Sequence, residues 1–275
     1  MDMQLRAGYS KEMKAFIRTN RFVILISVFI ALGILYPLLI RGMGALMLAM
    51  SDTYYELGMD VTILTEQLGS TATIGLTNAL SALTTIGLLV FLILINGFAG
   101  GEQKRRSIII PQNSGLESFS YLFPKFIIYP LSIFAFTVVS VIVAAAVSVW
   151  AFEFNNIVLI NLLVAAALAG LFNMFYVCLH LALGTSTGKA GMSSAICIVV
   201  SILLSDALSL AGIVPAFNPV TMHVTATLIA SGAEMRPGII VGVGITLALM
   251  LAVFSIALFV QNAKRIDNSG NEIII

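Results

Sequence analysis

Residues 184–189, GTSTGK, form the stretch whose letters come nearest to known catalytic motifs. A phosphate-binding loop has the pattern G-x-x-x-x-G-K-[ST]. Here Leu183 stands where the pattern needs its first glycine, and Ala190 stands where it needs serine or threonine. As a nucleophile elbow, G-x-S-x-G, the stretch places Ser186 between two glycines, but that motif needs a strand before its turn. The stretch falls instead between two long apolar runs, where we expect a tight turn and no nucleotide site.

An intramembrane serine protease is the enzymatic alternative, with Ser186 as the nucleophile and His180 or His223 as its base. A nucleophile and its base must lie within hydrogen-bond reach of each other. His180 is six residues before Ser186 in the same apolar run, and His223 is predicted on the opposite side of the membrane. Neither histidine is well placed, so we expect a chain without enzymatic activity.

Ionisable residues inside apolar runs mark transport pathways and proton relays in membrane proteins. His180 and Asp206 are predicted to lie inside such runs. At about 1.5 Å per residue their depths differ by roughly 20–25 Å, so they cannot pair directly. Asp206 and Asn96 remain candidate pathway residues, and an ion-coupled secondary transporter is the second alternative.

Cys178 and Cys197 show neither C-x-x-C nor metal-type spacing. We expect both to be small buried side chains. The sequence predicts no metal site and no cofactor bound by this chain.

Six long apolar runs must position these residues. The chain is 59% apolar with a mean hydropathy of +1.05. A helical crossing takes about 20 residues, because lipid offers the backbone no hydrogen-bond partner. The predicted spans are 22–40, 74–98, 126–150, 157–183, 190–212 and 238–260. We therefore expect an all-α membrane protein with six transmembrane helices in a single domain, residues 1–275.

The distribution of lysine and arginine predicts the orientation. With the N-terminus inside, twelve of the fourteen basic residues fall on the cytoplasmic side, and only Arg41 and Arg236 fall outside. The first outer loop is acidic and contains Asp52, Glu56, Asp60 and Glu66. We expect a multi-pass protein of the plasma membrane with both termini in the cytoplasm and no nucleic-acid partner.

Residues 1–21 predict an amphipathic helix that lies in the plane of the inner leaflet and contacts the lipid bilayer. Its apolar side chains recur at helical spacing: Leu5, Tyr9, Met13, Phe16 and Ile17. Its basic side chains lie mostly on the other face: Arg6, Lys11, Lys14 and Arg18. The apolar run that follows, residues 22–40, is not followed by an A-x-A cleavage site, so we expect it to be a retained anchor rather than a signal peptide.

Two further segments are too broken to cross a membrane. Residues 101–125 begin polar and basic and continue as a half-apolar stretch interrupted by Pro111 and Gly115, which predicts short helices on the cytoplasmic surface. Residues 213–237 are apolar but interrupted by Pro215 and Pro219, which predicts a broken, re-entrant hairpin on the outer side before the last span.

This layout resembles the permease subunits of type-2 ABC exporters. The resemblance covers the whole chain and is strongest in residues 101–125, where Glu102, Ser107 and Lys125 stand at the family's Glu, Thr and Lys positions. The chain departs from the family pattern at Ser107, at Gly115 where proline is common, and at Pro124 where glycine is common. The Asn-Pro pair before the last span appears as residues 218–219.

The resemblance implies a transport permease that works as a dimer of two copies and docks two cytosolic ABC ATPase subunits, which bind the ATP and Mg. The ATPase-coupling residues it implies are Glu102, Gln103, Lys104, Arg105, Arg106, Ser107, Glu117 and Lys125. Tyr9, Met13, Phe16 and Arg18 of the in-plane helix are expected to contribute to the same contact. A pathway with few charges, lined by spans one, two and five, favours an amphipathic peptide or lipophilic drug as cargo.

Overall fold

The structure is a computed structural model, and it describes residues 3–50, 71–104, 115–152, 156–204, 207–208, 218–235 and 238–270. Within these ranges the chain is helical and contains no strand. Among the described residues, five helices are long and apolar enough to cross a membrane: Arg21–Met47, Ala72–Ala99, Ser118–Ala151, Leu159–Thr187 and Gly238–Lys264. This agrees with the predicted all-helical membrane protein.

The first predicted span is preceded by a separate helix. Helix α1 (Met3–Arg18) ends in a turn at Asn20, whose φ of 57° lies in the left-handed region. Helix α2 (Arg21–Ala49) starts directly after this turn and runs beyond the predicted end at residue 40. Helix α1 therefore ends three residues before its predicted limit at residue 21, and α2 starts one residue before its predicted start at residue 22.

The second long helix is built from three continuous pieces. Helix α5 (Ala72–Ala82) widens into a π-helical turn, η1 (Leu83–Gly87), and continues as α6 (Leu88–Ala99). A one-turn helix, α7 (Gly101–Lys104), follows immediately. Within the described part of the predicted surface segment 101–125, residues 101–104 form a helix of their own.

Helix α9 (Ser118–Ala151) begins earlier than predicted. Residues 118–125, expected as part of the surface segment, form its first two turns. The reason is packing: Phe119, Phe123 and Phe126 recur at helical spacing, and each ring contacts Phe254 of helix α14 (Gly238–Gly270). At 34 residues α9 is about 50 Å long, which exceeds a bilayer core of about 30 Å.

The fifth predicted span is described only as far as residue 204. Helix α11 (Ala190–Val199) continues as a π-helical turn, η2 (Val200–Leu204). These two pieces rise about 22 Å together, which is less than the thickness of a bilayer core. Most of the predicted span beyond them, including Asp206, lies outside the described residues, so the sixth crossing stays a prediction.

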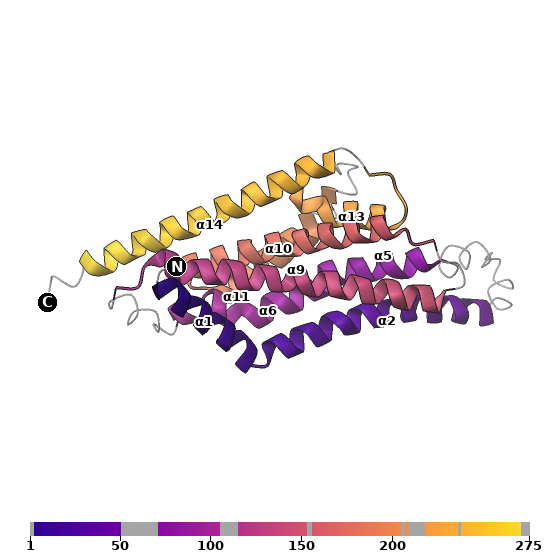
Figure 1. The fold of residues 1–275 in the computed structure, drawn as a ribbon, viewed down its shortest axis with the longest axis horizontal. Helices are drawn as coiled ribbons and strands as arrows, with labels where there is room; N and C mark the ends of the chain where they lie inside the picture. The colour runs from indigo at the N-terminus through magenta and orange to yellow at the C-terminus, as the bar shows by residue number, and fades with distance from the viewer. Residues whose placement is uncertain are drawn as a thin grey trace.

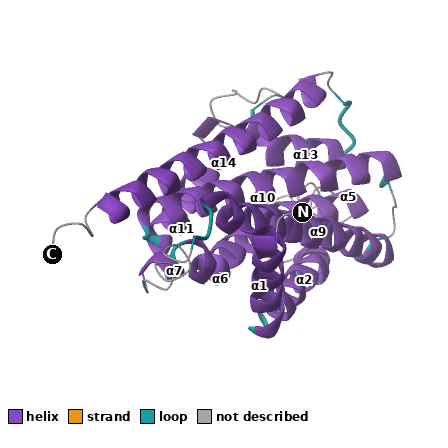
Figure 2. Ribbon diagram, turned by 60° about the vertical axis from the view of Figure 1, so that its left-hand side comes forward, coloured by secondary structure: helices purple, strands orange, loops and turns teal. Residues whose placement is uncertain are grey.

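The centre of the bundle is formed by α9 and α10 (Leu159–Thr187). Helix α14 lies on one side of this pair, and α1 and α2 lie on the other (Figures 1 and 2). A short helix, α13 (Met222–Ala230), follows a 3₁₀ turn, η3 (Pro219–Thr221), near the end of the bundle where α5 begins. Asn218 caps η3 by accepting a hydrogen bond from Val220 N at 3.0 Å.

We call the end that contains α1, α7 and the turn from α10 to α11 the basic end (left in Figure 1). The lysines whose side chains are described belong to elements that meet there: Lys11, Lys14, Lys125, Lys189 and Lys264. Helices α2 and α9 approach closely in the bundle, because Gly33 lies against the backbone of Ser140 and Ser140 Oγ donates to the Phe29 carbonyl.

Candidate functional site

Four charged side chains meet at the basic end, and we call Lys11, Glu12, Glu102 and Lys125 the ionic cluster. Lys125 Nζ lies 2.8 Å from Glu102 Oε2 and 3.4 Å from Glu12 Oε1. Lys11 Nζ lies 2.6 Å from Glu102 Oε1 and 3.7 Å from Glu12 Oε1. Two positive and two negative charges are thus brought together from α1, α7 and α9.

Lys125 is the most deeply buried member of the ionic cluster. Its side chain is 0% exposed and that of Glu12 is 3% exposed, whereas Glu102 is 21% exposed. Its ammonium group donates to the Phe98 carbonyl at 2.9 Å as well as to Glu102, and lies 4.7 Å from the centroid of the Tyr121 ring. A buried ammonium without a carboxylate partner is strongly destabilising. The fold therefore tolerates Lys125 only while a carboxylate stays beside it.

Glu102 is ionised throughout the physiological pH range. Burial raises the pKa of its carboxyl group, but the ammonium groups of Lys125 and Lys11 outweigh burial and lower the pKa to about 2. A carboxylate with so low a pKa is poorly suited to take up or release protons near neutral pH. The ionised carboxylate of Glu102 is instead suited to binding a cation, and both Lys11 and Lys125 lie within reach of it.

An aromatic stack supports the carboxylate of Glu12. Tyr129 donates its hydroxyl to Glu12 Oε2 at 2.9 Å, and the Phe98 ring stacks on Tyr129 with centroids 5.0 Å apart. The guanidinium of Arg21 lies 4.5 Å from the Phe98 centroid and donates to the Leu94 carbonyl at 2.9 Å. The start of α2 is thereby connected through α6 to the ionic cluster.

Helix α1 holds both ends of the segment between α6 and α9. Gln4 accepts a hydrogen bond from Glu117 N at 3.2 Å and donates its amide to the Gly115 carbonyl at 3.4 Å. Two helical turns further along α1, Lys11 binds Glu102. The residues between these two attachment points, 105–114, lie outside the described part of the chain. Helix α1 therefore fixes the two points from which that segment departs.

A pocket of about 420 Å³ lies between α1 and the start of α9, directly beside the ionic cluster. Its lining residues are Gln4, Ala7, Gly8, Lys11, Glu12, Leu116, Ser120 and Tyr121. The two helices approach closely at Gly8, because a Cβ there would lie 2.7 Å from the Ser120 carbonyl oxygen. The docking of α1 on α9 thus depends on a residue without a side chain.

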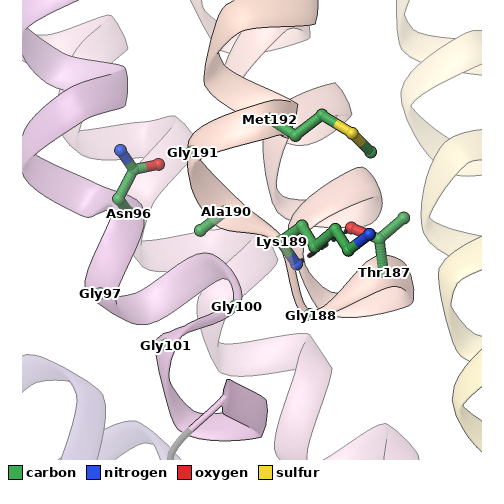
Figure 3. A pocket seen from close by; sticks show the side chains of 10 residues that line it. All are labelled: Asn96, Gly97, Gly100, Gly101, Thr187, Gly188, Lys189, Ala190, Gly191 and Met192. Carbon is green, nitrogen blue, oxygen red and sulfur yellow. Dashed lines mark hydrogen bonds between the residues drawn. The ribbon is translucent and has the colours of Figure 1, made fainter.

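A larger pocket, of about 830 Å³, lies between the end of α6 and the turn from α10 to α11 (Figure 3). Its lining residues are Asn96, Gly97, Gly100, Gly101, Thr187, Gly188, Lys189, Ala190, Gly191 and Met192. Asn96 lies at the basic end and accepts a hydrogen bond from Ser194 Oγ of α11 at 2.6 Å. Because Gly101 opens α7, the pocket adjoins the first attachment point of the segment between α6 and α9.

The geometry of the turn from α10 to α11 explains why positions 184 and 188 are glycines. Gly188 has a φ of 69°, a left-handed conformation typical of a helix C-terminus. Gly184 packs against the end of α6, since a Cβ on Gly184 would lie 2.8 Å from the Ala99 Cβ. Lys264 of α14 donates to the Ser186 carbonyl. The predicted tight turn between two helices is confirmed, and no strand precedes it.

His180 is bonded to a different serine from the one that its sequence position suggests. Its Nδ1 lies 2.8 Å from Ser193 Oγ, and both side chains are buried. Ser193 Oγ also donates to the Ala190 carbonyl at 2.7 Å, and in the part of the chain that the structure describes His180 Nε2 has no hydrogen-bond partner. His223 lies on α13, with its ring 4.7 Å from that of Phe172. The structure pairs neither histidine with Ser186.

The predicted in-plane residues divide between two environments. Phe16 is buried, with its ring 5.4 Å from that of Tyr129, and Tyr9 lies 6.3 Å from the Phe123 ring. Burial raises the pKa of the Tyr9 hydroxyl above its ordinary value, so it stays neutral. Met13, Ile17 and Arg18 are exposed. The buried face of α1 is therefore narrower than the predicted apolar face.

The predicted coupling residues are only partly brought together. Glu102 and Lys125 bind each other, whereas Glu117 is exposed just before α9. Gln103 and Lys104 belong to α7, but their side chains lie outside the described atoms. Arg105, Arg106, Ser107 and Asp206 fall outside the described residues.

Glu12, Tyr129 and Gln4 were missed by sequence reasoning. Glu12 nevertheless carries a detectable signal, because it is the acidic residue of α1 and lies three residues after Tyr9 and four before Phe16. This spacing places it on the apolar face. A charged residue that is forced into an apolar face needs an opposite charge on the surface it covers. Tyr129 and Gln4 gave no comparable signal.

No family model, curated protein or solved structure matches the chain in comparisons with known proteins. Its function must therefore be inferred from its own residues and their geometry.

Proposed function

We propose that the chain is the membrane-spanning subunit of an ATP-driven exporter of the type-2 ABC class. In this proposal six crossings place both termini in the cytoplasm of a plasma-membrane protein. Two copies form the translocation pathway, and each copy docks a separate ATPase subunit that binds ATP and Mg. This chain supplies the pathway and the docking surface, and the partner supplies the energy.

The ionic cluster is the observation that carries this proposal. It joins α1, the first turn after α6 and the start of α9, which are the elements that flank the segment predicted to receive the ATPase. Lys125 Nζ binds both Glu102 and the Phe98 carbonyl, so a displacement of α7 acts directly on α9 and α6. A mechanical link of this kind is what a subunit without its own nucleotide site needs.

The gathering of lysines at the basic end supports cytoplasmic placement of that end, in accordance with the positive-inside rule. The exposed faces of α2 and α14 are strongly apolar, with Leu35, Leu39, Ile240 and Phe259 among their side chains. Such faces suit lipid and the second copy of the chain. They also favour an amphipathic peptide or a lipophilic compound as cargo.

Co-purification and ATP hydrolysis test the proposal. The full chain, co-expressed with a candidate P-loop ATPase subunit, should retain that ATPase through purification and show vanadate-sensitive hydrolysis in lipid vesicles. Glu102→Gln should lower cargo-stimulated hydrolysis by about tenfold, because it weakens the hold on Lys125. Glu234→Gln removes the same charge from an exposed site in the loop before α14 and should leave hydrolysis unchanged. A complex whose hydrolysis is equally insensitive to both substitutions would contradict the proposed coupling.

A second candidate function, ion-coupled secondary transport, is favoured by the buried polar face of α10. Asn173 Oδ1, Tyr176 OH and His180 Nε2 have no hydrogen-bond partner among the described residues, and the three residues follow each other at helical spacing. Unpaired buried polar atoms often bind water or an ion. Flux driven by a proton or sodium gradient through vesicles that contain only this chain would select this function over the exporter.

A further inference from the structure

We infer that Glu12 is a positioning residue that serves as the reserve counterion of Lys125, so that Glu102 can move away without leaving a buried ammonium unpaired. The inference rests on the proposed function for its biological purpose. Its physical content, a competition of two carboxylates for one lysine, can be tested on the chain alone.

The distances from Lys125 Nζ show that Glu102 is hydrogen-bonded to it and that Glu12 is close but not hydrogen-bonded. An ammonium group has three donors. Two of them make short bonds, to the Phe98 carbonyl at 2.9 Å and to Glu102 at 2.8 Å. Glu12 Oε1 lies 3.4 Å away, which is longer than the 2.7–2.9 Å of a charge-assisted hydrogen bond. A shift of about 0.5 Å would convert this contact into such a bond.

Glu12 is anchored to α9, the helix that carries Lys125. Tyr129, which donates to Glu12 Oε2, lies one helical turn after Lys125 on the same face of α9. Close packing of Gly8 against the Ser120 carbonyl holds α1 on this helix as well. When α9 moves, Glu12 is therefore expected to stay beside Lys125.

Glu102 is attached differently. It lies on α7, next to the segment that is proposed to contact the ATPase, and it is more exposed than Glu12. Its second partner, Lys11, is 57% exposed on a long side chain that can follow it. The ionic cluster thus divides into two neutral pairs, Glu102 with Lys11 and Glu12 with Lys125. Separation of the pairs leaves no net charge buried in the protein.

A double-mutant cycle on the full chain in detergent tests this division. Glu12→Gln, Glu102→Gln and the double variant are unfolded thermally in the presence of a thiol-reactive dye, which reports the exposure of the buried Cys178 and Cys197. Each single variant keeps one carboxylate beside Lys125, whereas the double variant keeps none. The unfolding temperature of the double variant should fall by about 5–10 °C more than the sum of the decreases in the two single variants. Additive shifts would overturn the inference. Glu234→Gln is the control for loss of one charge.

A transport measurement tests whether the reserve counterion serves coupling. In the assembled exporter, Glu12→Gln should lower cargo transported per ATP hydrolysed by about tenfold, and Glu12→Asp should restore part of it because the carboxylate returns. Unchanged transport per ATP would overturn the role in coupling. If no ATPase binds and no ATP is hydrolysed, the proposed function fails, while the double-mutant cycle still decides whether the two carboxylates share Lys125.

Discussion

The ionic cluster and the polar contacts in the middle of the bundle bury polar groups in different ways. At the basic end, full charges are held by several partners each. In the middle, the contacts between helices are made by uncharged groups: Asn173 Nδ2 donates to Thr137 Oγ1 at 2.9 Å, and Ser140 donates to the Phe29 carbonyl. The first arrangement is strong and can be rearranged, whereas the second is weak and fixes how helices pack.

The difference follows from the distance to water. Lys11 and Glu102 of the ionic cluster retain some contact with solvent, so their charges are only partly desolvated. In the middle of a bilayer no water is present to solvate a charge, and hydrogen bonds between helices there contribute little to the free energy of unfolding on average. In the proposed exporter, the interactions whose breaking and re-forming would accompany a conformational change are therefore expected at the basic end.

The largest expected effect comes from Lys125→Met, which keeps the length of the side chain but leaves Glu12 and Glu102 without their shared cation. We expect a loss of about 3–5 kcal/mol in the free energy of unfolding, the usual cost of breaking a buried ion pair. Unfolding in mixed detergent micelles, followed with the thiol-reactive dye, measures it. Lys14→Met on the exposed face of α1 is the matched control. Equal free energies of unfolding for the two variants would show that Lys125 contributes no more to stability than an exposed lysine.

An intermediate effect is expected from acid. The pKa of Glu102 is about 2 in the folded protein, below its ordinary value of 4.5, so the unfolded chain takes up the proton first as pH falls. The contribution of Glu102 is complete above about pH 5 and is lost as the pH falls towards 2, with a total of about 3 kcal/mol. Unfolding midpoints measured between about pH 6 and pH 3 should drop less steeply in Glu102→Gln. Parallel profiles for both proteins would contradict this assignment.

The smallest effect is expected in the middle of the bundle. Thr137→Val removes the hydroxyl that accepts from Asn173 but keeps the shape of the side chain, so we expect a loss of about 0.6 kcal/mol. Thr85→Val is the control, because its hydroxyl bonds to the Ser81 carbonyl within the same helix. A loss for Thr137→Val as large as that for Lys125→Met would remove the contrast between the two regions.

The sequence was sufficient for the elements that depend on local pattern. Apolar runs located the five long helices, because each must be apolar wherever it faces lipid or its neighbours. The tight turn after α10 was also predictable, since Gly188 supplies the left-handed residue that ends a helix. The early start of α9 was not, because it depends on Phe254, more than a hundred residues later in the chain.

The candidate site was predictable only in part. Glu102 and Lys125 were singled out through a resemblance, but their direct contact depends on how α6 packs against α9. Glu12 joins them only because α1 docks on α9 at Gly8, and that docking is a property of two surfaces rather than of either sequence segment. His180 shows the same limit, because its partner Ser193 comes from the facing helix and not from the motif-like turn.

The length of the last helix has a consequence for its fit to the lipid bilayer. The apolar part of α14, Gly238–Lys264, is about 40 Å long, and it leans across α9 and α10 in Figure 1. A bilayer core of about 30 Å accommodates such a length by helix tilt. Helix α14 packs along α10, contacts the start of α9 through Phe254 and donates from Lys264 to the Ser186 carbonyl, so a change in its tilt would act on both of these helices. We therefore expect the acyl-chain length of the surrounding lipid to affect the contact between α14 and the start of α9.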